Sequence, residues 1–246
     1  METAGYDPGA LGPDPERLDR IGAFVELHVE QGRALDLSGD RVGIASAIWP
    51  HGRWRFDFRG EANHAGTTRL ADRRDPMLPY AETVLAARRE AELAGAVATF
   101  GKIAVEPNGV NAIPPSYAAG STPAPPTKEP GHRGRGRTGG RPRPRAGARR
   151  QPRRRTRVLH PVVGFDHALR DELARILGSD TGLAVPVLGT GAGHDAGILS
   201  GRVPTAMLFV RNPTGVSHSP AEYATEDDCV AGVLALADVL EGLACA

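Results

Sequence analysis

Apolar and polar residues alternate from Val25 to Glu30, and this period of two predicts a β-strand over 24–30. One face of the strand would be aliphatic, whereas the other would carry Glu26, His28 and Glu30. Carboxylates are costly to bury unless they are paired or bind a metal ion. Two interpretations therefore stay open on the local sequence: an edge strand with one face in water, or a strand that presents ligands to a metal.

Helices and further strands are predicted along most of the chain outside one central region. Strands are expected at 44–49, 53–59, 97–105, 183–188 and 205–210. An apolar stripe predicts a helix over 77–94, and Asp166 can cap the first turn of a second helix. Thr225 and Asp228 form a capping box that starts the last helix. Together these elements predict an α/β fold.

The central region, 115–157, has a different composition from the rest of the chain. It contains no Val, Ile, Leu, Phe, Met or Trp, and it holds 12 Arg and one Lys against a single acidic residue. The whole chain has 30 Lys and Arg against 29 Asp and Glu, so the remainder is acidic. A segment with so little apolar surface cannot offset the entropy lost on ordering, and we expect it to be disordered.

This basic region has two possible explanations. As a nucleic-acid-binding arm, residues 131–157 would neutralise phosphates, but no aromatic residue is interleaved with the arginines to stack on bases. Alternatively, the segment is not native protein sequence. Translation of a GC-rich gene in the wrong reading frame yields stretches rich in Arg, Pro, Gly and Ala, as seen here. We favour the second explanation.

Composition sets the expected compartment. Two cysteines, Cys229 and Cys245, are too few and too close to the C-terminus for a disulfide framework. No apolar run approaches the length of a membrane span, and the first residues lack the pattern of a signal peptide. We therefore expect a cytoplasmic protein without a membrane partner.

Five short motifs follow one another in the sequence: ELHVEQG, GEANHAGTT with RRDP after it, PNGVNAIP, GTGAGHDA and SHSPAE. Taken singly, a loop His or a turn Asn more often serves its own loop. In this order the motifs resemble the amidase/hydantoinase/carbamoylase family of the di-metal aminoacylase and exopeptidase superfamily. That family includes N-carbamoyl-L-amino acid hydrolases, allantoate amidohydrolases and β-ureidopropionases. The resemblance covers about 20–114 and 158–244.

The resemblance implies roles for six residues. His28 and His218 match ligands of two divalent ions, for which Zn, Mn, Ni or Co would serve. His64 matches the catalytic imidazole that polarises the scissile carbonyl and reaches across the homodimer in many relatives. The residues matched to substrate binding are Gln31, His64, Asn111 and His194. The substrate implied is an N-carbamoyl amino acid or another ureido compound.

The resemblance also implies an architecture. We expect a partial di-metal exopeptidase-like catalytic domain, formed by 1–47 and 158–246. An incomplete α+β lid or dimerisation domain of ferredoxin-like type would be inserted at 48–114, as the first half of the lid. The disordered region at 115–157 would follow it.

The chain departs from the family in two places. Family members carry, before the point where this chain begins, a His, a bridging Asp, a Glu ligand and a general-base Glu. After the NAIP turn they carry a strand that ends in Asp-x-Arg, and the Arg binds the substrate carboxylate. Residues 115–157 contain no Asp-x-Arg motif. We therefore expect an inactive or impaired hydrolase fragment. The alternatives are a nucleic-acid-binding protein that uses 131–157, or a non-catalytic dimerisation remnant.

Overall fold

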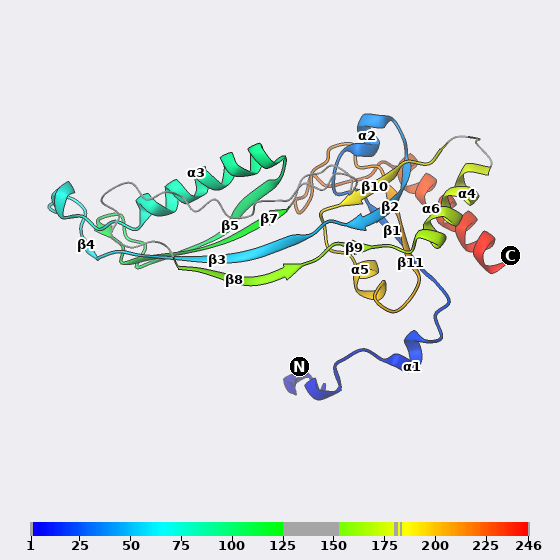
Figure 1. Ribbon diagram of the computed structural model, residues 1–246, viewed down its shortest axis with the longest axis horizontal. Helices are drawn as coiled ribbons and strands as arrows, with labels where there is room; N and C mark the ends of the chain where they lie inside the picture. The colour runs from blue at the N-terminus through cyan, green and yellow to red at the C-terminus, as the bar shows by residue number, and fades with distance from the viewer. Residues whose placement is uncertain (1, 125–152, 180–181, 183, 246) are drawn as a thin grey trace. The chain divides into compact units, whose positions relative to one another are not determined.

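The computed structural model describes residues 2–124, 153–179, 182 and 184–245 (Figure 1). The chain forms two compact units. Unit 1 consists of Met1–Ile48 and Val163–Ala246, and unit 2 consists of Trp49–Val162. From the sequence, the first part of the catalytic domain is expected to end at residue 47 and its second part to begin at residue 158. Each unit contains its own main sheet and its own core, and no helix among the described residues is long and apolar enough to cross a bilayer.

Unit 1 is built on a mixed five-stranded sheet. Its strand order is β1 (Phe24–Val29), β11 (Thr205–Val210), β2 (Val42–Ile48) and β10 (Val187–Thr190), and the short β9 (Val163–Gly164) also pairs with β2. Strand β1 lies at the edge and runs parallel to β11. All six residues of β11 are buried, because β11 has a neighbouring strand on each side and packed side chains on both faces.

Two clusters of apolar residues form the core of unit 1. One joins the sheet to α4 (His167–Ser179) and α6 (Glu226–Ala244), and its fully buried members include Leu173, Leu208 and Val239. The other includes Leu35 of α2 (Ala34–Ser38) and Ala196 of α5 (Asp195–Leu199). The sheet of unit 1 is thus an interior layer, as in α/β proteins.

The predicted helix caps of unit 1 are confirmed. Asp166 accepts a hydrogen bond from the backbone N–H of Leu169 at 2.8 Å, and Thr225 accepts one from that of Asp228 at 3.1 Å. The strand expected at 183–188 begins only at Val187. Pro186 interrupts that apolar run and has no N–H for the ladder, so the strand starts after it.

The remaining short elements of unit 1 lie near the N-terminus. Two 3₁₀ helices, Glu2–Ala4 and Pro8–Ala10, precede α1, a single turn at Pro15–Leu18. Asp14 caps α1 by accepting from the backbone N–H of Arg17 at 3.2 Å. In the sequence, Asp14 as a capping residue and Pro15 at the first helical position predict a helix over 15–21, so α1 is shorter than predicted.

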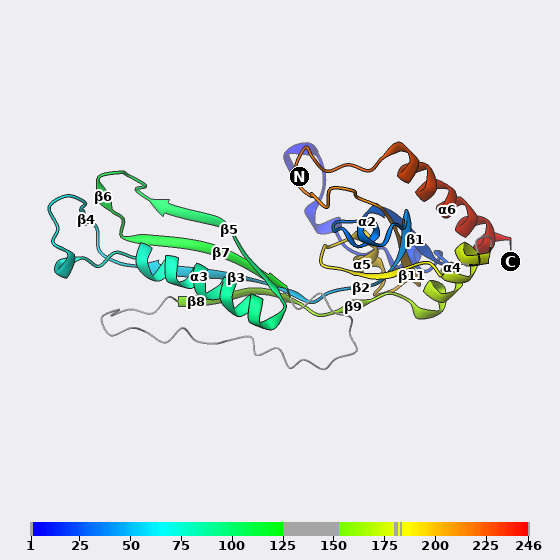
Figure 2. The same ribbon diagram turned by 90° about the horizontal axis from the view of Figure 1, so that it is seen from above.

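Unit 2 is built on an antiparallel sheet with one long helix. The strand order is β5 (Val97–Glu106), β7 (Ser116–Ala124), β3 (His51–Arg59) and β8 (Arg153–His160), and Figure 2 shows these strands side by side. Helix α3 (Met77–Ala94) matches the predicted bounds and lies along one face of the sheet (Figure 1). A separate ribbon pairs β4 (Asn63–His64) with β6 (Ala112–Ile113), and a 3₁₀ turn covers Leu70–Asp72.

The expectation of disorder over 115–157 is wrong at both ends of that region. Strand β7 is an inner strand, and three of its side chains, Tyr117, Ala119 and Ser121, are buried. The Tyr117 ring stacks on Tyr80 of α3 with centroids 5.7 Å apart. Small side chains are enough to form this strand because β7 has a hydrogen-bonded strand on each side. The local sequence, which lacks large aliphatic residues, gives no sign of these neighbours. Residues 125–152 of that expectation lie outside the described residues.

Candidate metal centre

Three potential metal ligands converge in unit 1. Glu26 and His28 lie on β1 two residues apart and therefore on the same face of the strand. His194 ends the loop between β10 and α5. One ligand atom from each of the three residues lies within 4.8 Å of the other two. Elements far apart in the sequence thus bring a carboxylate and two imidazoles together beside the edge strand.

Glu26 is held in place by the start of α5. Its Oε2 accepts a hydrogen bond from the backbone N–H of Ala196 at 2.7 Å, and its Oε1 lies 3.6 Å from Nδ1 of His194. The positive end of the helix dipole stabilises a carboxylate at this position. One carboxylate oxygen of Glu26 is therefore fixed by a hydrogen bond, while the other faces the imidazole of His194.

His28 has a defined tautomer. Its Nδ1 lies 2.7 Å from the carbonyl oxygen of Val29, an acceptor, so the proton belongs on Nδ1. Nε2 is then left with a lone pair. The ring meets His194 edge to face, with centroids 4.7 Å apart. This is the arrangement in which a second hydrogen bond orients a metal-binding imidazole.

His194 is the most buried member of the group. Burial lowers the pKa of His194 and the nearby His28 acts in the same direction, whereas the carboxylates of Glu26 and Asp195 oppose the shift. The imidazole is therefore neutral near pH 7. Its Nε2 lies 3.3 Å from the hydroxyl oxygen of Thr190, but its Nδ1 is buried without a hydrogen-bond partner.

The chemistry of the group fits a divalent transition-metal ion. A buried nitrogen without a partner costs free energy, and an ion bound to Nδ1 would satisfy it. A carboxylate oxygen and two imidazole nitrogens are ligands that Zn, Mn, Ni and Co accept. The orphaned Nδ1 of His194 is the observation that makes the fit specific.

Glu30 does not belong to this group, although the alternation of β1 placed it on the polar face. Its carboxylate accepts from the backbone N–H groups of Ala34 at 2.7 Å and Leu35 at 2.9 Å. Glu30 therefore caps the first turn of α2, and its burial is compensated by these two hydrogen bonds.

The structure does not bring His218 into the group. His218 lies in the loop that follows β11, its side chain is exposed, and its backbone N–H donates to Glu222 at 2.8 Å. Asn212, which is fully buried, fixes this loop by accepting hydrogen bonds from Thr214 and Gly215. Among the described residues, the imidazole that contacts His28 is that of His194, and the role of His218 as a metal ligand stays a prediction.

The other predicted site residues divide between the two units. Gln31 is half-buried and is the second residue after β1 in unit 1. His64 and Asn111 both lie at the β4–β6 ribbon of unit 2, where the carbonyl of Asn111 accepts from the N–H of Ala65 at 3.0 Å. The motif resemblance did not include Glu26 among the metal ligands, although the alternation already placed its carboxylate on the same face as His28.

The ribbon fixes the tautomer of His64. Its Nδ1 accepts from the backbone N–H groups of Gly66 at 3.0 Å and Thr67 at 3.2 Å. The proton of the neutral ring is therefore on Nε2, and the exposed His64 offers that N–H as a donor.

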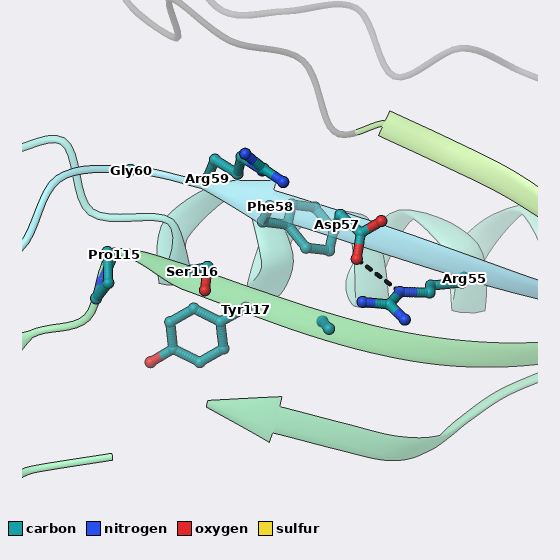
Figure 3. A pocket seen from close by; sticks show the side chains of 9 residues that line it. Arg55, Asp57, Phe58, Arg59, Gly60, Pro115, Ser116 and Tyr117 are labelled. Atoms are coloured by element: carbon teal, nitrogen blue, oxygen red, sulfur yellow. Dashed lines mark hydrogen bonds and ion pairs between the residues drawn. The ribbon is translucent and has the colours of Figure 1, made fainter. Parts of the chain in front are cut away.

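Unit 2 also contains a pocket of about 430 Å³ on β3 and β7 (Figure 3). Arg59, Ser116 and the ion pair of Arg55 with Asp57, at 2.7 Å, line it. None of the predicted site residues lines this pocket.

Comparison with known proteins decides the family. The model of peptidase family M20/M25/M40 matches residues 9–242. The chain belongs to this family. It is 33% identical over 249 residues to an N-carbamoyl-L-amino acid amidohydrolase of Geobacillus stearothermophilus, and 34% identical over 273 residues to an allantoate amidohydrolase of Escherichia coli. The resemblance read from the motifs is confirmed.

The matched length is partial for the M20 relatives. The alignment covers 94% of this chain and 57% of the Geobacillus protein, and 99% and 59% for the Escherichia protein. A crystal structure of an amidase of the hydantoinase/carbamoylase family from Burkholderia vietnamiensis superposes with a TM-score of 0.74 at 25% identity. That match covers 89% of this chain and 54% of the other. The chain thus spans a little over half the length of these relatives.

Proposed function

We propose that this chain is part of an M20 amidohydrolase that uses divalent metal ions to hydrolyse a linear amide or ureido C–N bond. The observation that carries the proposal is the convergence of Glu26, His28 and His194, with a buried ring nitrogen that lacks a partner. The names of the relatives supply the substrate class, an N-carbamoyl-L-amino acid or allantoate.

The three residues would hold an ion through atoms that the structure leaves available. Oε1 of Glu26 offers a negative charge, Nε2 of His28 offers a lone pair, and Nδ1 of His194 offers another when its proton is on Nε2, beside Thr190. A bound ion supplies Lewis-acid polarisation of the carbonyl and a water of lowered pKa. His218 is retained as a proposed ligand on the motif resemblance alone.

Substrate would be positioned by residues with hydrogen-bonding groups. Nε2–H of His64 would donate to the oxygen on which negative charge develops, since its Nδ1 is occupied by two backbone N–H groups. Gln31 and Asn111 would bind the polar ends of the substrate. Homodimer formation, which the motif resemblance implies, stays a prediction.

Metal binding tests the proposal directly. Metal-free protein titrated with Mn²⁺ or Zn²⁺ in a calorimeter should bind an ion, and His194→Ala or Glu26→Gln should weaken binding about tenfold or more. His167→Ala is the matched control, because it removes an exposed imidazole on α4. Equal affinity in wild type and His194→Ala would refute the assignment.

Hydrolysis is the second measurement. The described residues form one group of three ligands, and a second ion would need ligands of its own. We therefore expect weak or undetectable hydrolysis of N-carbamoyl amino acids by this chain alone at saturating Mn²⁺. Rates equal to those of the Geobacillus relative would contradict this expectation.

A further inference from the structure

Two imidazoles face each other where the chain enters and leaves unit 2. His51 is the first residue of β3 and His160 is the last residue of β8. They are direct partners in the antiparallel ladder. Their rings stack, with centroids 4.5 Å apart and planes inclined by 23°. Neither residue belongs to the Glu26–His28–His194 group or to any motif of the sequence analysis.

The spacing of the rings suits a shared ion. An ion bound at about 2.0–2.1 Å from each of two ring nitrogens holds those nitrogens roughly 3–4 Å apart. Stacked rings in a direct cross-strand pair reach that separation by rotation about side-chain bonds. His160 is exposed and His51 is half-buried, so water can complete the coordination of the ion.

His51 also has a second hydrogen-bonding contact of the kind that orients a ligand. Its Nδ1 lies 3.3 Å from the carbonyl oxygen of Trp49, which can only accept. The proton therefore belongs on Nδ1, and Nε2 is left with a lone pair. Metal-binding imidazoles commonly donate their other N–H to a carbonyl in this way.

The backbone on either side of the pair is restricted. Pro50 precedes His51 and Pro161 follows His160, and each proline ring fixes its own φ. The ladder fixes the positions of the two Cα atoms. Little backbone freedom is then lost when an ion binds, which favours affinity through preorganisation.

We propose that His51 and His160 form a binding site for a divalent transition-metal ion. Two imidazoles favour Cu²⁺ over Ni²⁺ and Zn²⁺ in the usual order of stability. The bound ion joins the beginning of β3 to the end of β8 and so links the two strands through which the chain enters and leaves unit 2.

The chain carries a local reporter for this site. Its two tryptophans, Trp49 and Trp54, lie within three residues of His51 in the sequence. Bound Cu²⁺ quenches indole fluorescence at short range, whereas Zn²⁺ does not. Titration of the metal-free full chain with Cu²⁺ should quench tryptophan fluorescence to a saturating plateau, and excess Zn²⁺ should compete with the quenching.

Substitutions separate this site from the group in unit 1. His51→Ala and His160→Ala should each raise the Cu²⁺ concentration for half-quenching about tenfold or more, because one of two ligands is lost. His194→Ala and His167→Ala should leave both the extent of quenching and the free Cu²⁺ concentration at half-quenching unchanged. Far-UV circular dichroism checks folding, and His51→Asn and His160→Asn serve as polar replacements if the alanine variants misfold.

The outcomes are distinct. Loss of quenching in the His51 and His160 variants, with His194→Ala unaffected, supports the site, and Zn²⁺ should then raise the melting temperature of wild type more than that of His160→Ala. Unchanged quenching in the variant that carries both His51→Ala and His160→Ala overturns the proposal. Quenching lost in His194→Ala but kept in the double variant also overturns it, while leaving the function proposed for unit 1 intact.

Discussion

Units 1 and 2 bury their sheets in different ways. In unit 1, helices and apolar clusters cover both faces of the sheet, and every residue of β11 is buried. In unit 2, the core cluster lies between the sheet and α3, and most residues of β5 are exposed. The first arrangement can exclude water around a carboxylate and two imidazoles, which strengthens their electrostatic interactions. The second leaves its chemistry on exposed ribbons and strand ends.

This difference assigns stability to different residues. Unit 2 depends on a small aromatic group, in which Phe58, Tyr80 and Tyr117 pack on one another. Unit 1 distributes its core over two clusters of aliphatic and aromatic side chains. Loss of one aromatic residue should therefore affect unit 2 more than loss of one aliphatic residue affects unit 1.

The largest effect is expected from Phe58→Ala. Phe58 is 1% exposed at the centre of the unit 2 core, and its truncation should lower the free energy of unfolding by about 3–5 kcal/mol. Amide hydrogen exchange should show lost protection in β3, β5 and β7, with β11 still protected. Leu85→Ala, at a position on α3 that is 68% exposed, is the control and should change stability by less than about 0.5 kcal/mol. Simultaneous loss of protection in both units would show that they unfold as one.

Leu208→Ala is the corresponding change in unit 1. Leu208 of β11 is fully buried in the cluster that includes residues of α4 and α6. The cavity left by its truncation should lower the free energy of unfolding by about 2–5 kcal/mol. Exchange protection should fall in β1, β2 and β11 but stay unchanged in β7. An effect on β7 as large as that on β11 would break the comparison.

Asp228→Asn tests a buried ion pair that only unit 1 contains among the described residues. Asp228 is fully buried and pairs with Arg211 at 2.8 Å. Burial raises the pKa of Asp228, but hydrogen bonds from Thr225 and Arg211 and the charges of Arg211 and Arg41 outweigh it and hold the pKa below its ordinary value. Replacement should cost about 2 kcal/mol at pH 7.

The pH dependence of that cost follows from the direction of the shift. A carboxyl group whose pKa is lowered by folding stabilises the fold above its unfolded pKa, and this contribution disappears as the pH falls through the folded value. The difference between wild type and Asp228→Asn in urea denaturation should thus be constant above about pH 5 and shrink below about pH 4. A difference that grows on acidification would contradict the assignment.

Glu30→Gln should give the smallest effect. It weakens the two charge-assisted hydrogen bonds at the start of α2 and should cost about 1 kcal/mol. Because Glu30 caps a helix, Mn²⁺ affinity should stay within about twofold of wild type. A tenfold loss of Mn²⁺ affinity would instead place Glu30 in the metal group. Glu26→Gln is the positive control, because it should lower the Mn²⁺ affinity.

Strong periodicity and capping residues made much of the fold predictable. Strand β11 and helix α3 have the predicted bounds, since one is a continuous apolar run and the other ends at a glycine. Strand β7 could not be predicted, because Ala118 and Ala119 have little β propensity of their own. Its neighbours β3 and β5 supply the hydrogen bonds and the packing, and neither is visible in the local sequence.

The candidate site was predictable in its parts but not in its assembly. His28 and His194 both stand in motifs that the sequence analysis identified, but their contact depends on sheet order and on the loop before α5. Glu26 and Glu30 look alike in the alternating pattern. Only the turn into α2 shows that one carboxylate joins the imidazoles and the other caps a helix.

The anchoring of Glu26 has a consequence for α5. One carboxylate connects the first turn of that helix to the two imidazoles, so a change of charge beside β1 also changes the strength of the bond to Ala196. Exchange of the Ala196 amide proton therefore records the electrostatic state of the centre from within the backbone.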